Sequence, residues 1–195
     1  MADTDILRNL LRNHLSGGPS VDAPMPPRIA SMLRNHHLES ALVPVLPAAA
    51  RTPRLDEDRT VARHRTAWLL MELERILPPL AQSECHPVVL KGAALAMAHY
   101  PDPLDRWFVD TDLLVPMDRV DAACSALSDL GYVALDGDRF ESYYDRHHLH
   151  RVMVGPSRAV VEIHWNLTIP SSVYRHDPEG VRERAVTVPL GRTIC

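Results

Sequence analysis

The first part of the chain places its apolar residues at helical spacing. Residues 3–15 show this spacing clearly and predict a short amphipathic helix. Residues 16–27 contain two glycines and four prolines and predict a linker. A second helix is expected over residues 28–42. Residues 1–80 are therefore predicted to form a helical N-terminal region.

The longest helical pattern begins at Asp56. Its apolar stripe faces one way, while arginines and glutamates occupy the other side. We expect Pro78 and Pro79 to end this helix, because proline disfavours helical geometry in the residue before it.

The pattern changes after about residue 85 to short apolar runs typical of strands. The segments HRVMV (150–154) and AVVEIHWNL (159–167) are separated by GPSR and predict an antiparallel hairpin. An amphipathic helix is expected over 117–130, with Gly131 as its left-handed cap. Further expected elements are strands at 86–90, 107–115 and 132–135 and a Lys-Gly turn leading into a short helix at 93–100. Residues 81–195 therefore predict an α+β domain with a small mixed or antiparallel sheet flanked by helices.

Composition narrows the class of protein. The chain has 195 residues, 46% of them hydrophobic and 24% charged, with a net charge of −4, so no strong basic field favours nucleic acid as a partner. The three cysteines form no CxxC pair, and no apolar run is long enough to cross a membrane. These features predict a cytoplasmic protein with no membrane partner.

Acidic residues stand where the pattern predicts buried strands. Asp110 and Asp112 are two positions apart in WFVDTDLLV, so they would share one face of a strand. Glu162 stands between valine and isoleucine in a second strand, with His164 on its face. Buried carboxylates need a cationic partner or a divalent cation, and Asp-x-Asp pairs also occur as exposed strand ends or turn caps. The third acid favours a metal site.

Histidines offer a weaker signal. His147, His148 and His150 form the run HHLH, but no second ligand cluster at zinc-site spacing accompanies it. A polar loop explains the run equally well. His164 could hydrogen-bond a carboxylate or phosphate, or serve as a satisfied structural residue.

Several motifs together resemble one family. LKGAALAMAHYPDPLDRWFVDTDLLVP, followed by LGY and by HHLHRV…VVEIHWNL, resembles the uncharacterised nucleotidyltransferases of the DNA polymerase β superfamily. The resemblance covers roughly residues 88–167 and implies the nucleotidyltransferase fold. It also implies that the chain lacks a C-terminal helical part, because members of the family usually continue past this segment.

The resemblance implies roles for individual residues. Asp110, Asp112 and Glu162 would bind catalytic Mg²⁺ or Mn²⁺, with Glu162 near the acceptor hydroxyl. The residues implied to bind the nucleotide or its phosphates are Lys91, Gly92, Arg106, His148 and His164.

The implied reaction moves a nucleoside monophosphate from an NTP, expected to be ATP, to a hydroxyl of a small molecule or protein. In the wider superfamily a serine follows the glycine of the phosphate turn, whereas Ala93 stands there in this chain. The alternative is therefore a catalytically silent binding or pathway-accessory protein with a protein partner.

Overall fold

The computed structural model describes residues 3–17, 28–135, 149–174, 176–191 and 193–194. Their contacts form two compact units. The helical unit comprises Met1–Trp68 and Leu95–Phe108, and the sheet unit comprises Leu69–Ala94 and Val109–Cys195. The predicted domain boundary between residues 80 and 81 stays a prediction.

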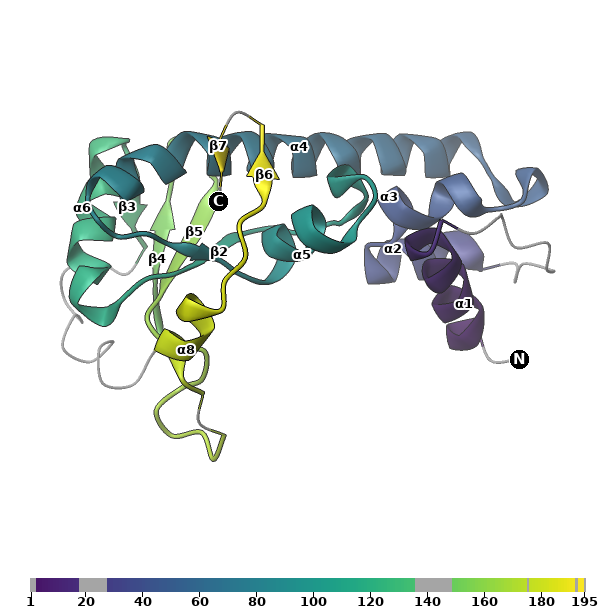
Figure 1. Ribbon diagram of the computed structural model, residues 1–195. Helices are drawn as coiled ribbons and strands as arrows, with labels where there is room; N and C mark the ends of the chain where they lie inside the picture. The colour runs from purple at the N-terminus through teal and green to yellow at the C-terminus, as the bar shows by residue number, and fades with distance from the viewer. Residues whose placement is uncertain (1–2, 18–27, 136–148, 175, 192, 195) are drawn as a thin grey trace. The chain divides into compact units, whose positions relative to one another are not determined.

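Three short helices build the core of the helical unit (Figure 1). They are α1 (Asp3–Leu15), α2 (Ile29–His36) and α3 (Glu39–Leu42). The amphipathic helix predicted over 3–15 is confirmed, and its Leu10 is fully buried.

The single helix predicted over 28–42 is wrong. His37 adopts a left-handed conformation, with φ of 54°, and its N–H donates to the Arg34 carbonyl. The chain bends at this cap and then begins α3. The bend lets Leu33 of α2 and Leu42 of α3 both reach the same apolar cluster. Two short 3₁₀ turns follow, η1 (Val43–Val45) and η2 (Ala48–Ala50).

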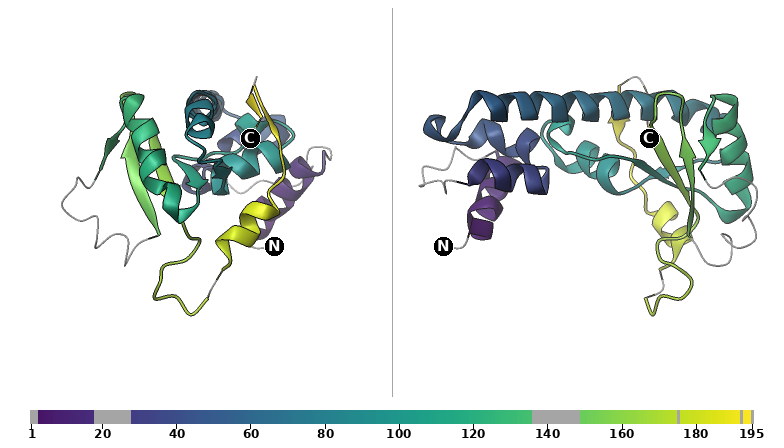
Figure 2. Two further views of the ribbon diagram at one scale, coloured as in Figure 1. Left: turned by 60° about the vertical axis from the view of Figure 1, so that its left-hand side comes forward. Right: turned by 180° about the vertical axis from the view of Figure 1, so that it is seen from behind.

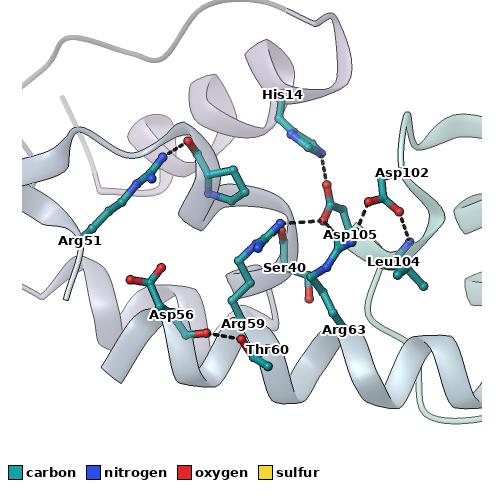
Figure 3. A network of polar contacts seen from close by, with 11 residues as sticks. His14, Ser40, Arg51, Asp56, Arg59, Thr60, Arg63, Asp102, Leu104 and Asp105 are labelled. Carbon is teal, nitrogen blue, oxygen red and sulfur yellow. Dashed lines mark hydrogen bonds and ion pairs between the residues drawn. The ribbon is translucent and has the colours of Figure 1, made fainter. Parts of the chain in front are cut away.

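Charged side chains form a second, polar cluster in the helical unit (Figure 3). The carboxylate of Asp105 is buried and lies 2.5 Å from Nη1 of Arg63 and 3.8 Å from Nη2 of Arg59. His14 contributes Nε2 at 3.4 Å from the same carboxylate. Arg63 also contacts Asp102 at 2.8 Å, and Asp102 caps η3 (Pro103–Asp105) by accepting from the Leu104 N–H. Two basic helical residues therefore hold the loop that carries both aspartates.

The long helix α4 (Pro53–Gln82) begins and ends beyond the predicted limits. The prediction that Pro78 and Pro79 end it is wrong, because both lie inside its last turn and a half. An interior proline costs about 3 kcal/mol, but Leu77 and Leu80 are buried, and each buried leucine stabilises by about 1.5–3 kcal/mol. This burial offsets much of the lost hydrogen bonding.

The sheet unit contains a five-stranded mixed sheet in the order β1-β2-β5-β4-β3 (Figures 1 and 2). Its strands are β1 (Val88–Val89), β2 (Thr111–Leu114), β3 (Val133–Ala134), β4 (His150–Val154) and β5 (Val160–His164). β2 and β5 are parallel, and the remaining neighbours are antiparallel. The predicted α+β class, mixed sheet and β4–β5 hairpin are confirmed. The strand predicted over 107–115 is shorter than expected, so Asp110 immediately precedes β2.

Helices α5 (Lys91–His99) and α6 (Val120–Asp129) follow β1 and β2 in the chain, with η4 (Met117–Arg119) leading into α6. α6 contacts β3 and β5, and its buried Ala123 and Leu127 lie on the apolar side. Gly131 has a φ of 84° after this helix, as its predicted left-handed cap requires.

The C-terminal segment contributes α8 (Pro178–Glu183) and a separate two-stranded ladder. β6 (Pro189–Leu190) pairs with β7 (Thr193–Ile194) in antiparallel fashion. The polar face of the five-stranded sheet carries the acids discussed next.

Candidate active site

Two of the predicted acids face each other across neighbouring strands. β2 and β5 pair in parallel, and their register sets Asp112 directly beside Glu162. Side chains of paired residues point to the same face of a sheet. Asp112 is 2% exposed, and the side chain of Glu162 is 18% exposed. Two carboxylates from segments far apart in sequence therefore share one site.

Lys91 supplies a cation to these acids. Its ammonium Nζ lies 2.5 Å from Oδ1 of Asp112 and 3.7 Å from Oε2 of Glu162. Lys91 has a φ of 46°, so the backbone reverses at this residue between β1 and α5. The prediction of a Lys-Gly turn before the helix needs correction, because Lys91 and Gly92 already belong to the first turn of α5.

His164 joins the same carboxylates from the end of β5. Its Nε2 lies 2.8 Å from Oδ1 of Asp112 and 3.1 Å from Oε2 of Glu162, so the ring N–H can donate to this pair. The ring is 2% exposed. Of the two roles open for His164, hydrogen bonding to a carboxylate is the one seen here.

The pKa values of the charged groups reflect this arrangement. Burial opposes ionisation of Asp112, but hydrogen bonds from His164 and Lys91 outweigh it and hold the pKa of Asp112 below its usual value. Burial also opposes the charge on Lys91, yet the bond to Asp112 raises the pKa of the ammonium. At neutral pH, Asp112 and Lys91 form an ion pair.

Asp110 behaves differently. Burial raises the pKa of its carboxyl, and repulsion from Asp112 and Glu162 raises it further, with Lys91 opposing the rise only in part. The carboxylate of Asp110 therefore interacts electrostatically with those of Asp112 and Glu162. The three acids carry more negative charge than the single ammonium neutralises.

His150 is a residue that sequence reasoning left out of this site. In the β4–β5 register it stands directly opposite His164. The two rings are 4.8 Å apart between centroids, and Nε2 of His150 lies 4.0 Å from Oε1 of Glu162. The run HHLH drew attention to His150, but only the strand register shows that His150 approaches Glu162.

Arg106 and His148 were also predicted to contact the nucleotide, and Ala93 was noted in the phosphate turn. Arg106 belongs to the helical unit, where its Nη1 donates to the carbonyl of Trp107 at 2.7 Å. His147 and His148 lie outside the described residues. Ala93, in the position of the superfamily's serine, is 1% exposed. The structure therefore brings together Lys91, Asp110, Asp112, Glu162 and His164.

The chain matches a known family over most of its length. Residues 27–194 match the family described as uncharacterised nucleotidyltransferase. The chain belongs to this nucleotidyltransferase family. Comparison with curated proteins and with solved structures found no significant match.

Membership assigns the general chemistry of nucleotidyltransferases, the transfer of a nucleoside monophosphate. It covers β2 and β5, and therefore both strands that carry the acids. Among the described residues, no helix of this nucleotidyltransferase-family chain combines the length and apolar character needed to cross a membrane.

Proposed function

We propose that this protein is a metal-dependent nucleotidyltransferase that moves a nucleoside monophosphate from an NTP, ATP in the first instance, to a hydroxyl of a small molecule or protein. One observation carries the proposal. Asp112 and Glu162 lie side by side in register, with Asp110 near enough to repel both. Such a concentration of carboxylates favours a divalent cation.

The donor set fits Mg²⁺ or Mn²⁺. Asp110, Asp112 and Glu162 offer carboxylate oxygens, the ligands that these ions prefer. Lys91 supports the fit, since its ammonium approaches both Asp112 and Glu162 and marks a place that attracts positive charge. When bound, the metal supplies charge neutralisation for the phosphates and activates the attacking oxygen.

Two residues of the chain have further roles in this proposal. The side chain of Lys91 is 59% exposed, so its ammonium can meet phosphate oxygens from the solvent side. Glu162 is partly open to solvent and accepts from His164, which fixes its orientation beside an incoming hydroxyl. These contacts support a role for Glu162 as the general base that takes the proton of the acceptor. The phosphate contacts of Gly92, Arg106 and His148 stay predictions from the sequence.

One observation favours the second candidate, a catalytically silent accessory protein. Ala93 lies in the first turn of α5, and its methyl side chain has no hydroxyl to donate to a phosphate at this position. The accessory protein and the enzyme differ in nucleotide turnover, so the measurements described next distinguish the two candidates.

The first experiment measures thermal stabilisation of the chain by each of the four NTPs, with and without Mg²⁺ or Mn²⁺. A ligand at 100 times its dissociation constant stabilises by about 2.7 kcal/mol, which corresponds to a rise of about 5–10 °C in Tm for a chain of this size. We expect this rise with one NTP, only with metal, and not in Asp112→Asn or Glu162→Gln. Asp118→Asn changes an exposed acid of η4 and is the matched control.

Turnover is then measured as pyrophosphate release with candidate acceptors. Asp112→Asn and Glu162→Gln are each expected to lower the rate by about 10²–10³-fold, the loss typical of removing one group that stabilises the transition state. Circular dichroism should show that each variant is folded. If no NTP stabilises the wild-type chain under any metal condition, the proposal is wrong. Metal-dependent NTP binding without turnover on any acceptor, together with a stable protein partner, would favour the accessory role.

A further inference from the structure

A group of nitrogen and oxygen donors lies next to the proposed carboxylate site. His150, Glu162 and His164 each offer one ligand atom, and these atoms lie within 4.8 Å of one another. His150 and His164 face each other on antiparallel strands, and Glu162 is on the same face two residues before His164. The strands therefore hold all three donors in place without any loop.

The carboxylate of Glu162 lies between the two imidazoles. Its Oε1 faces Nε2 of His150 at 4.0 Å, and its Oε2 faces Nε2 of His164 at 3.1 Å. In a tetrahedral site with bonds of about 2.1 Å, two ligand atoms are about 3.4 Å apart. The two separations from Glu162 bracket this value. Ring movements of about 1–1.5 Å would bring the widest separation in the group, within 4.8 Å, to the same value.

Burial also suits a metal with one open position. His164 is 2% exposed, whereas the side chains of Glu162 and His150 are 18% and 26% exposed. One side of the group is thus enclosed by protein and the other can be reached by solvent. Two histidines and one glutamate are a ligand set that binds Zn²⁺ while leaving a fourth position for water.

We propose that His150, Glu162 and His164 form a site for a borderline transition-metal ion, with Zn²⁺ or Co²⁺ as the preferred ion. Imidazole favours these ions, whereas Mg²⁺ prefers oxygen donors alone. The site differs from the carboxylate site in its two imidazoles and shares Glu162 and His164 with it. A bound ion takes the place of the proton on the ligating nitrogen of His164, which otherwise faces Asp112 and Glu162. It goes beyond the proposed function and does not require that function to be correct.

The test uses Co²⁺ as a spectroscopic probe on the full chain after treatment with a chelator, without nucleotide. We expect one equivalent of Co²⁺ to give the strong visible absorption of a four-coordinate ion, and Zn²⁺ to displace it. A large excess of Mg²⁺ should leave the absorption unchanged. Calorimetric titration with Zn²⁺ should show the same single site.

Variants identify the ligands. His150→Ala and Glu162→Gln should weaken Zn²⁺ binding by at least about 10–100-fold, the loss typical even of a residue that only supports a ligand. His176→Ala, which changes an exposed histidine of the same unit, should bind as wild type does. Asp110→Asn should also retain the cobalt spectrum, because Asp110 belongs only to the carboxylate site.

A further variant guards against a simple folding defect. His150→Cys offers a thiolate in place of the imidazole, so cobalt binding should return with an added charge-transfer band from sulfur. Unchanged Zn²⁺ affinity in His150→Ala overturns the proposal, as does failure of the wild-type chain to bind either ion. If the wild-type chain gives the cobalt spectrum but binds no NTP, the metal site stands and only the proposed function is contradicted.

Discussion

The two units each gather buried acids, but they surround them with different neighbours. In the helical unit, Asp105 meets Arg63 and Arg59. In the sheet unit, the charges of Asp112 and Glu162 act on Asp110, and Lys91 opposes them in part. Burial raises the pKa of both Asp105 and Asp110. Arg63 acts to lower the pKa of Asp105, whereas the acidic neighbours of Asp110 raise its pKa further.

This difference separates a structural cluster from a site that needs a ligand. Arginine stays charged at any pH that a protein meets, so the cluster around Asp105 brings its own counter-charges. Among the described residues of the sheet unit, the three acids Asp110, Asp112 and Glu162 have Lys91 as their cationic neighbour. Negative charge therefore remains uncompensated on a face that is partly open to solvent. This uncompensated charge, rather than the closeness of the acids, is the reason to expect a bound cation there.

Breaking the arginine cluster should give the largest change in stability. Arg63→Met leaves the buried Asp105 without its nearest partner, at 2.5 Å, and removes the pairing of Asp102. Removing one member of a buried ion pair costs about 3 kcal/mol or more. Urea unfolding followed by circular dichroism measures this loss.

Arg54→Ala is the control for that measurement. Arg54 is 74% exposed and pairs with Asp58 on the surface of α4, so its loss should cost less than about 0.5 kcal/mol. Equal effects of the two substitutions would show that the cluster around Asp105 contributes no more than a surface pair.

Neutralising an acid in the sheet unit should have the opposite sign. Asp110→Asn removes a charge that Asp112 and Glu162 repel, so the free energy of unfolding at pH 7 should rise by about 0.5–1 kcal/mol. Metal-dependent NTP stabilisation should disappear in the same variant. Chemical unfolding and the thermal shift assay report the two effects, and a loss of stability in Asp110→Asn, relative to Asp118→Asn, would remove the contrast between the units.

The smallest expected effect concerns Asp102 and its dependence on pH. Burial opposes its ionisation, but hydrogen bonds from Arg63 and from the Leu104 N–H prevail and lower the pKa of Asp102 from 3.8. A lowered pKa stabilises the folded state above the unfolded value, and this contribution is lost as the pH falls through the folded value. Asp102→Asn keeps the cap but not the charge, so it should cost about 0.5 kcal/mol at pH 7.

Unfolding curves at pH 7 and at pH values below 3.8 would measure that dependence. The difference between wild type and Asp102→Asn should shrink toward the acidic end. If the difference in the free energy of unfolding grew on acidification, the pKa of Asp102 could not be lowered in the folded state.

Local pattern was enough to predict the parts of the fold that depend on near neighbours. The β4–β5 hairpin followed from two apolar runs around GPSR, and the placement of Glu162 and His164 on one face followed from strand alternation. Pro78 and Pro79 misled the prediction, since their local preference yields to the burial of Leu77 and Leu80, which only the folded chain shows.

Long-range pairing set the limit of prediction in the site. The carboxylates of Asp112 and Glu162 were expected to lie together. The approach of the Lys91 ammonium to both depends on the positive φ of Lys91, which the sequence pattern did not predict. The position of His150 opposite His164 could be known only from the register of β4 against β5. Arg63 and Asp105 are joined across 42 residues without any motif that marks the pair.

The strand order has a consequence for how the chain folds. β5 lies between β2 and β4, although it is the last of the five strands in the sequence. β4 and β5 are close in sequence and can pair early, whereas contacts across long sequence separations form slowly. We therefore expect the hairpin to assemble first and to dock onto β2 as a unit, so that Asp112 and Glu162 come together only in the last step of sheet formation.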